Sequence, residues 1–245
     1  MRQPFDTETI GSRNIHISLP PSYAHDDRRY PVVYIQDGAT LARNCFNQLE
    51  HKFIAGELPE VILVGIEPIN RNDDYTPWPA KSLTGTYADF GGKGDDYLDY
   101  LAETLKPHID QAYRTESTAA HTAIIGASFG GMITLYAAFR KPHVFGRFGA
   151  LSPSVWYERF LTFVHETPLP QADQKIYMSV GNLEGIHKTS IQRHMVPYSH
   201  DARRALEHHG LGGDRLKFEV EEGGTHDQVF FAKHFVSALE WLYAG

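Results

Sequence analysis

The chain has 245 residues, of which 42% are hydrophobic and 22% are charged, so it can bury a large core and is neither disordered nor fibrous. Its 23 Lys and Arg against 30 Asp and Glu give a net charge of −7, which argues against a nucleic-acid partner and a polybasic membrane-binding face. The single cysteine, Cys45, excludes an internal disulfide and a thiolate metal cluster.

The length of the sequence favours one domain. Residues 1–245 fit a single α/β unit, because such units commonly reach this size. Residues 1–6 lack the apolar stretch of a signal peptide, and the longest apolar runs, such as 61–66, have the length of strands. We therefore expect a cytoplasmic protein with no membrane partner.

Short apolar runs alternate with segments of helical period along the chain. This alternation predicts an α/β fold with a mostly parallel central sheet of about eight strands and helices on both faces. The segment 14–19 alternates apolar and polar residues, as in an edge strand, whereas 32–35 and 61–66 are continuously apolar, as in central strands. Further strands are predicted at 123–126, 148–151, 176–180 and 216–220.

Helices are predicted between these strands. Asp95 and Asp96 can cap a helix whose apolar residues recur every three or four positions, with Pro107 as a candidate kink. Other helices are predicted over 130–140, 198–208 and 228–243. The segment 67–94 is rich in Pro, Gly, Asn and Asp and has no clear period, so we expect a long, functional loop insertion there.

A G-x-S-x-G motif occupies residues 126–130, directly after a predicted strand and directly before a predicted helix. A turn of this kind, the nucleophile elbow, needs glycines where the strand and helix approach closely, and it presents a strained serine at a helix N-terminus. The motif therefore predicts Ser128 as a nucleophile. The alternative is a glycine-rich turn with an incidental serine.

A serine hydroxyl needs an imidazole base to act as a nucleophile at neutral pH. Of the 14 histidines, His226 follows the last predicted strand and should share the carboxyl edge of the sheet with Ser128. His121 precedes a strand and is expected at the opposite edge, whereas His208 and His209 lie near a helix end. His226 is therefore the predicted base.

An acid that orients the base is expected between the serine and the histidine in the chain. Glu184, in the loop after the strand that ends at 180, fits this position. Glu222, Asp227 and a Ser–His dyad without an acid remain alternatives.

The oxyanion formed during acyl transfer needs two backbone N–H donors. One is expected from Phe129, the residue after the nucleophile, and the other from the segment 36–39, with Ala39 as the favoured donor. No zinc motif, spaced Cys and His set or phosphate-binding loop is found, so neither a metal nor another cofactor is expected.

Together these segments resemble the esterase D-like branch of the α/β hydrolases, and within it the siderophore esterases that open the trilactones of enterobactin, salmochelin or bacillibactin. The resemblance covers nearly the whole chain, and segments 71–77, 126–131 and 152–156 carry it most specifically. It implies an α/β-hydrolase fold and assigns the nucleophile to Ser128, the base to His226 and the acid to Glu184.

A tris-catecholate ester is a large aromatic anion, so its site should offer aromatic faces and a guanidinium. Four residues in loops expected at the carboxyl edge of the sheet could supply them: Arg71, Trp78, Trp156 and Tyr157. Alternatively, the tryptophans pack the loops and Arg71 pairs with Asp73 or Asp74.

The sequence therefore predicts a serine hydrolase of carboxylic esters with an acyl-serine intermediate. Its expected partner is a small-molecule ester, such as an iron-siderophore lactone. A short-chain carboxylesterase and a thioesterase similar to S-formylglutathione hydrolase are alternatives. A different class of alternative is a non-catalytic ligand-binding protein on the same scaffold.

Overall fold

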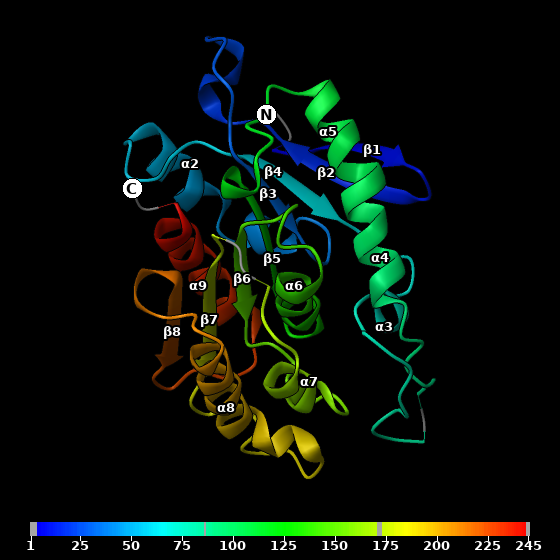
Figure 1. The fold of residues 1–245 in the computed structure, drawn as a ribbon. Coiled ribbons are helices and arrows are strands. Elements are labelled where there is room, and N and C mark those ends of the chain that lie inside the picture. Colours follow the sequence, from blue (N-terminus) through cyan, green and yellow to red (C-terminus); the bar gives the residue numbers. More distant parts are fainter. Residues whose placement is uncertain (1–3, 86, 171–172, 244–245) are drawn as a thin grey trace.

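The computed structural model describes residues 4–85, 87–170 and 173–243, and its strands form one eight-stranded sheet in the order β1-β2-β4-β3-β5-β6-β7-β8 (Figure 1). The strands β3 to β8 run parallel, whereas β1 and β2 run antiparallel to their neighbours. The prediction of an α/β fold with a mostly parallel sheet is thus confirmed. The strands are β1 (Asp6–Ile10), β2 (Arg13–Ser18), β3 (Val32–Ile35), β4 (Ile62–Ile66), β5 (Thr122–Ala127), β6 (Arg147–Leu151), β7 (Lys175–Gly181) and β8 (Leu216–Glu221).

The prediction of an edge strand at 14–19 was wrong. This segment forms β2, which lies between β1 and β4, and the edge strand is β1. Three of the five residues of β1 are polar and exposed, so its sequence carries little apolar signal. The turn between the two strands contains Gly11 with a φ of +63°, a conformation that favours glycine.

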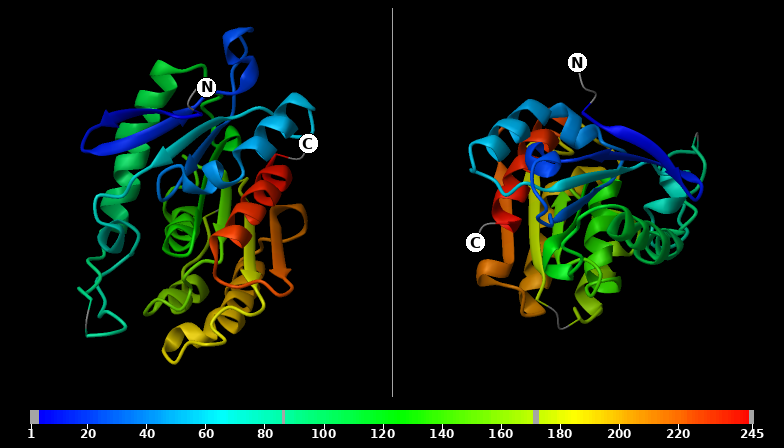
Figure 2. Two further views of the ribbon diagram at one scale, coloured as in Figure 1. Left: turned by 180° about the vertical axis from the view of Figure 1, so that it is seen from behind. Right: turned by 90° about the horizontal axis from the view of Figure 1, so that it is seen from above.

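Helices cover both faces of the sheet (Figure 2). One apolar core lies between the sheet and α4, α5, α6, α7 and α8, and a second lies between the sheet and α1, α2 and α9. The helices are α1 (Thr40–Asn44), α2 (Phe46–Ile54), α3 (Arg71–Asp74), α4 (Gly94–Tyr100), α5 (Lys106–Ala112), α6 (Phe129–Arg140), α7 (Phe160–Glu166), α8 (Met195–His208) and α9 (Gln228–Leu242).

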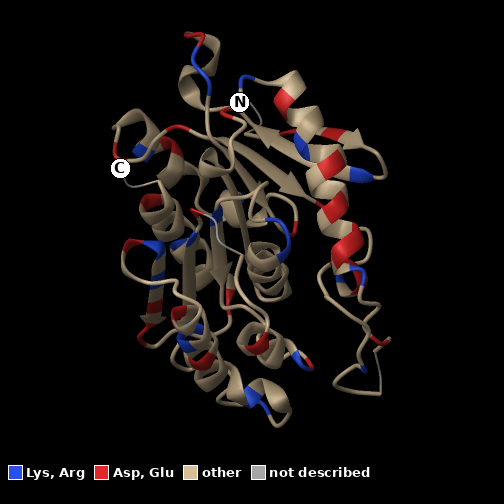
Figure 3. Ribbon diagram, viewed as in Figure 1, with Lys and Arg blue, Asp and Glu red and all other residues tan. Residues whose placement is uncertain are grey.

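The helix predicted near Asp95 is continuous through α4, a π-helical turn at Leu101–Leu105 and α5. Its predicted apolar residues are buried, but Lys93 rather than an aspartate occupies the N-cap position. Asp95 instead accepts hydrogen bonds from Arg140 and Tyr136. Acidic residues recur along this helix (Figure 3), so part of the net negative charge is gathered there.

The segment 67–94 is more ordered than a plain loop. It contains α3 and an antiparallel bridge between Ala80 and Phe90. Asp74 of α3 accepts two hydrogen bonds, of 2.6 and 3.0 Å, from the guanidinium of Arg13 on β2. Both side chains are buried, so this ion pair fixes α3 to the sheet.

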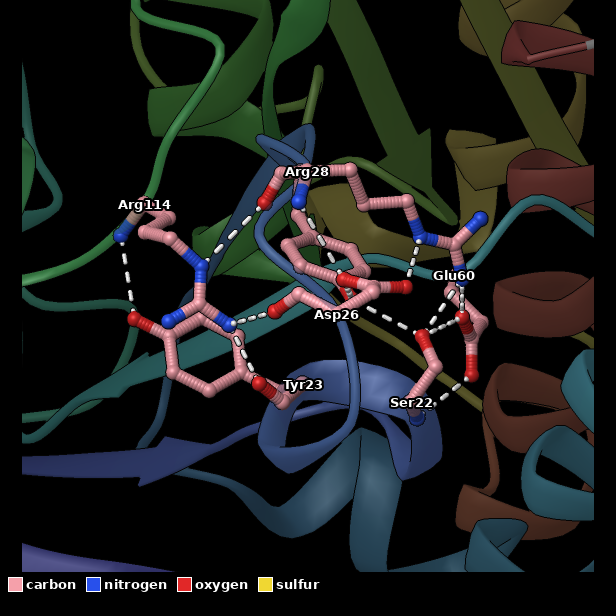
Figure 4. Close-up of polar contacts among 7 residues, drawn as sticks. Ser22, Tyr23, Asp26, Arg28, Glu60 and Arg114 are labelled. Carbon is pink, nitrogen blue, oxygen red and sulfur yellow. Dashed lines mark hydrogen bonds and ion pairs between the residues drawn. The ribbon is translucent and has the colours of Figure 1, made fainter.

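A polar network joins loops at the amino ends of β3 and β4 (Figure 4). Arg114 donates hydrogen bonds to the carbonyls of Tyr23, Asp26 and Arg28. Arg28 in turn pairs with Asp26 and with Glu60. The network stabilises the loops at the amino ends of the parallel strands, whereas the predicted catalytic residues lie at their carboxyl ends.

Within the described ranges, no helix has both the length and the hydrophobicity that crossing a bilayer requires.

Candidate active site

Ser128 lies on the sharp turn between β5 and α6 and has φ and ψ angles of +59° and −122°. This conformation is strained for a residue with a side chain. A Cβ atom at Gly126 would come within 2.5 Å of the Gly130 backbone, and one at Gly130 would lie 2.9 Å from Gln36 Cβ. The two glycines therefore let the strand, the helix and the neighbouring β3 approach closely enough to form the turn.

Ser128, His226 and Glu184 form a continuous hydrogen-bonded chain. His226 Nε2 lies 3.0 Å from Ser128 Oγ, and His226 Nδ1 lies 2.7 Å from Glu184 Oε2. Because a carboxylate only accepts hydrogen bonds, Nδ1 carries the ring proton and Nε2 offers its lone pair to the serine hydroxyl. The three residues come from the carboxyl ends of β5 and β7 and from the loop after β8.

The Glu184 carboxylate is buried and hydrogen-bonded, with only 1% of its side chain exposed. Oε1 accepts hydrogen bonds from Ser152 Oγ at 2.5 Å and from the Gly181 amide at 2.8 Å. Of the alternative acids, Glu222 accepts a hydrogen bond from Asn182, and Asp227 precedes α9. Of these three carboxylates, Glu184 is therefore the one that is hydrogen-bonded to His226.

Two serines of the segment after β6 also belong to the site, and the sequence analysis did not identify them. Ser152 donates to Glu184 and has a φ of +42°, while Ser154 Oγ lies 3.4 Å from Ser128 Oγ. The Ser154 amide also donates to the Ser128 carbonyl, at 3.0 Å. The family resemblance of segment 152–156 is the signal in the sequence that points to them.

The turn after β3 faces the elbow and contains two consecutive left-handed residues, Asp37 with a φ of +60° and Gly38 with a φ of +68°. Gly38 donates its amide to the Ile66 carbonyl at 2.7 Å. Ala39, the predicted oxyanion donor, is buried, and its neighbours Thr40 and Leu41 line the cavity beside Ser128. Phe129 is the first residue of α6, so its amide has no acceptor within the helix.

A cavity of about 510 Å³ opens beside Ser128 and His226. Arg71 lines it, but its guanidinium is paired with the Asp37 carboxylate, at 2.6 Å from Nε and 3.0 Å from Nη2. The alternative interpretation, in which Arg71 pairs with Asp73 or Asp74, was therefore wrong about the partner. Asp73 pairs with Lys93 and Asp74 with Arg13, because α3 directs Arg71 toward the elbow instead.

The aromatic residues predicted to contact substrate lie beside this cavity rather than in it. Trp156 and Tyr157 line a second cavity of about 670 Å³, and the Trp156 ring packs against the Phe129 ring at 5.5 Å between centroids. Trp78 lines neither cavity; it donates its indole N–H to the Glu158 carbonyl and packs in an aromatic cluster, as the alternative interpretation stated.

Other groups able to act as nucleophiles or ligands are poorly placed. Cys45 is buried, which raises the pKa of its thiol to about 12 and keeps it protonated. His121 precedes β5, at the opposite edge of the sheet from Ser128. Among the described residues, no group of three or more His, Cys, Asp or Glu side chains could hold a metal ion.

An eight-stranded, mostly parallel sheet with a strained serine on a strand-to-helix turn is the arrangement of the α/β hydrolases. The chain belongs to the family described as Putative esterase, whose model matches residues 7–242. It is therefore an esterase with an α/β fold.

Individual relatives span most of the chain. The chain is 39% identical to the uncharacterized protein YbbA of Bacillus subtilis over 99% of this chain and 97% of that protein. It is 29% identical to the ferri-bacillibactin esterase BesA of the same organism, over 73% of this chain and 68% of BesA. An IroE-like serine hydrolase from Shewanella oneidensis has a similar fold, with a TM-score of 0.82 at 22% identity over 96% of this chain and 79% of that one.

Proposed function

We propose that the protein is a serine esterase in which Ser128 is the nucleophile, His226 the general base and Glu184 the acid that orients the base. The observation that carries this proposal is the hydrogen-bonded chain from Ser128 Oγ through both ring nitrogens of His226 to a buried carboxylate. The strained elbow supports it, because the elbow presents the hydroxyl to the cavity at the start of a helix.

In the acylation step, His226 Nε2 removes the Ser128 proton while Oγ forms a bond to the ester carbonyl carbon. The resulting tetrahedral oxyanion is stabilised by the Phe129 amide and by a second amide from the segment 36–39, with Ala39 as the favoured donor. When the C–O bond of the ester breaks, the imidazolium returns the proton to the leaving alcohol. Glu184 stabilises the imidazolium throughout and keeps its own negative charge.

Hydrolysis of the acyl-serine repeats these steps with water as the nucleophile. His226 removes a proton from water, the hydroxide oxygen attacks the acyl carbon, and the Ser128 oxygen leaves with the proton that His226 returns. The products are a carboxylic acid and the free enzyme, so the cycle needs no metal or redox partner.

Replacing Glu184 by Gln should lower kcat by about 10²- to 10⁴-fold, because the amide can hold the wrong imidazole tautomer and cannot stabilise the imidazolium. Steady-state hydrolysis of p-nitrophenyl acetate measures the loss. Glu222→Gln is the matched control, since Glu222 is an exposed carboxylate bonded to Asn182 in the neighbouring loop. Equal rates for the two variants would show that a dyad suffices and that Glu184 has no orienting role.

We further propose siderophore lactones as the substrate class. Relatives with this activity in their names support the proposal, namely the ferri-bacillibactin esterase BesA and a siderophore triacetylfusarinine C esterase from Aspergillus fumigatus, 28% identical over 56% of this chain. Trp156 lines the second cavity, and its ring packs against the ring of Phe129, the residue that follows Ser128. Aromatic side chains therefore lie near the proposed nucleophile, where we expect them to contact the aromatic arms of such a ligand.

The test compares kcat/KM for iron-free and ferric catecholate trilactones with kcat/KM for p-nitrophenyl acetate. We expect hydrolysis of a trilactone to exceed that of the acetate by at least about 100-fold, because binding energy from the remote arms can be used in the transition state. A trilactone hydrolysed no faster than the acetate would leave a general carboxylesterase or thioesterase as the function. A wild-type protein that binds trilactone but is not labelled by a fluorophosphonate would instead be a ligand-binding protein.

A further inference from the structure

Asp37 places a carboxylate in the cavity that holds Ser128. A Cβ atom added at Gly130 would lie 3.2 Å from Asp37 Oδ2, so the carboxylate lies close to the first turn of α6. The proposed acyl transfer makes no use of this group, and an uncompensated negative charge here would repel the oxyanion. A carboxylate at this position therefore needs a structural reason and a counter-charge.

The structural reason is the turn between β3 and α1. Asp37 has a φ of +60°, and aspartate is one of the few residues with a side chain that is enriched in this conformation. Its amide donates to Tyr75 Oη at 2.8 Å, and its carbonyl accepts a hydrogen bond from Thr40 Oγ1 at 3.1 Å. Asp37 thus fixes the backbone that leads to the candidate oxyanion donors at the start of α1.

The counter-charge is Arg71. Its Nε and Nη2 atoms both donate to the Asp37 carboxylate, in the two-bond geometry that arginine forms best. The guanidinium carbon lies 5.5 Å from the centre of the Phe129 ring and 5.4 Å from that of the Tyr75 ring. Arg71 is therefore fixed between the turn after β3 and the residue that follows the nucleophile.

Arg71 owes its position to α3. The fully buried Tyr75 follows α3 directly, so this short helix supplies both the guanidinium and the hydroxyl that bind Asp37. The buried pair of Asp74 with Arg13 fixes α3 to β2. The turn after β3 is thus held in place by α3 and Tyr75, which do not belong to the hydrogen-bonded chain of Ser128, His226 and Glu184. Residues around a metal site orient the metal ligands in a similar way.

We propose that Arg71 is the fixed counter-ion of Asp37 and that the two form a positioning pair for the oxyanion site, rather than a site for substrate anions. Asp37 stabilises the conformation of the turn, but its carboxylate brings a negative charge close to Ser128. Arg71 neutralises this charge. The inference rests on the proposed serine-esterase function and assigns Arg71 a role that is independent of the substrate's charge.

The test is a double-mutant cycle with the uncharged substrate p-nitrophenyl acetate. Arg71→Gln should lower kcat and kcat/KM by about 10- to 100-fold with little change in KM, because it leaves a bare carboxylate near the oxyanion. The double variant Arg71→Gln/Asp37→Asn should be at least about fivefold faster than Arg71→Gln alone, since the repelling charge is gone. Arg71→Lys, which keeps the positive charge, should lose less activity than Arg71→Gln.

A matched control is the exposed pair Arg203 and Glu207 on α8, which are bonded at 2.6 Å and lie outside both cavities. Removing either or both of these charges should leave kcat unchanged. The inference is overturned if Arg71→Gln hydrolyses acetate at the wild-type rate, or if the double variant is no faster than Arg71→Gln.

Fluorophosphonate labelling of the wild type at Ser128 distinguishes this failure from failure of the proposed function. If the wild type is labelled but Arg71→Gln hydrolyses acetate at the wild-type rate, only the positioning pair is refuted. If the wild type is not labelled, the proposed serine-esterase function itself is refuted. Thermal unfolding of each variant shows that the compared proteins are folded.

Discussion

Replacing Ser128 by Ala should reduce kcat for p-nitrophenyl acetate by a factor of about a million, the order expected when the nucleophile of a serine hydrolase is removed. His226 and Glu184 cannot compensate for the loss, because the proposed acyl-enzyme can no longer form. Fluorophosphonate labelling should disappear in the same variant, and mass spectrometry of the wild type should locate the label on Ser128. Steady-state kinetics and labelling together measure the effect.

The Ser128→Ala variant should remain folded. Its lost hydroxyl lies at the cavity rather than in either apolar core, and removing a strained serine side chain leaves packing almost unchanged. Ser12→Ala, in the exposed turn between β1 and β2, controls for the substitution itself. Wild-type turnover by Ser128→Ala would refute the proposed mechanism, whatever the substrate.

Replacing His226 by Ala should reduce kcat by about 10⁵- to 10⁶-fold, since no other imidazole lies within hydrogen-bonding distance of Ser128 Oγ in the described part of the chain. Initial rates of the variant and of the wild type with p-nitrophenyl acetate at about pH 7.5 check this expectation.

His208→Ala is the matched control for this prediction, because His208 is exposed at the end of α8. That variant should retain wild-type kinetics. Hydrolysis by His226→Ala at the wild-type rate would remove His226 from the proposed role.

The sequence predicted the elements with a strong periodic signal. The strands β3 to β8 and the helix α6 lie where their patterns indicated, with ends that differ by a few residues. The edge strand β1 was not predicted, because it is short and mostly polar, and neither were the short helices α1, α2, α3 and α7. Such elements depend on tertiary contacts rather than on local propensity.

The candidate site was likewise predicted only in part. Ser128 follows from a local motif, and His226 and Glu184 follow from the rule that loops at the carboxyl edge of a parallel sheet converge. The contacts of Ser152 with Glu184 and of Arg71 with Asp37 join segments that are distant in sequence, at 2.5 and 2.6 Å. They depend on loop conformations that no periodicity encodes, and their pairing was therefore either missed or assigned to the wrong partner.

The distance along the chain between the two hydrogen-bonded partners has a consequence for biosynthesis. Ser128 and His226 are 98 residues apart, and β6, β7 and β8 must all pair before the imidazole reaches the hydroxyl. Contacts of this range form late, because the loop they close is long. In a nascent chain on the ribosome, Ser128 would therefore stay unreactive until β8 has paired and the loop after it is in place. Labelling of Ser128 by a fluorophosphonate would then report that folding is complete.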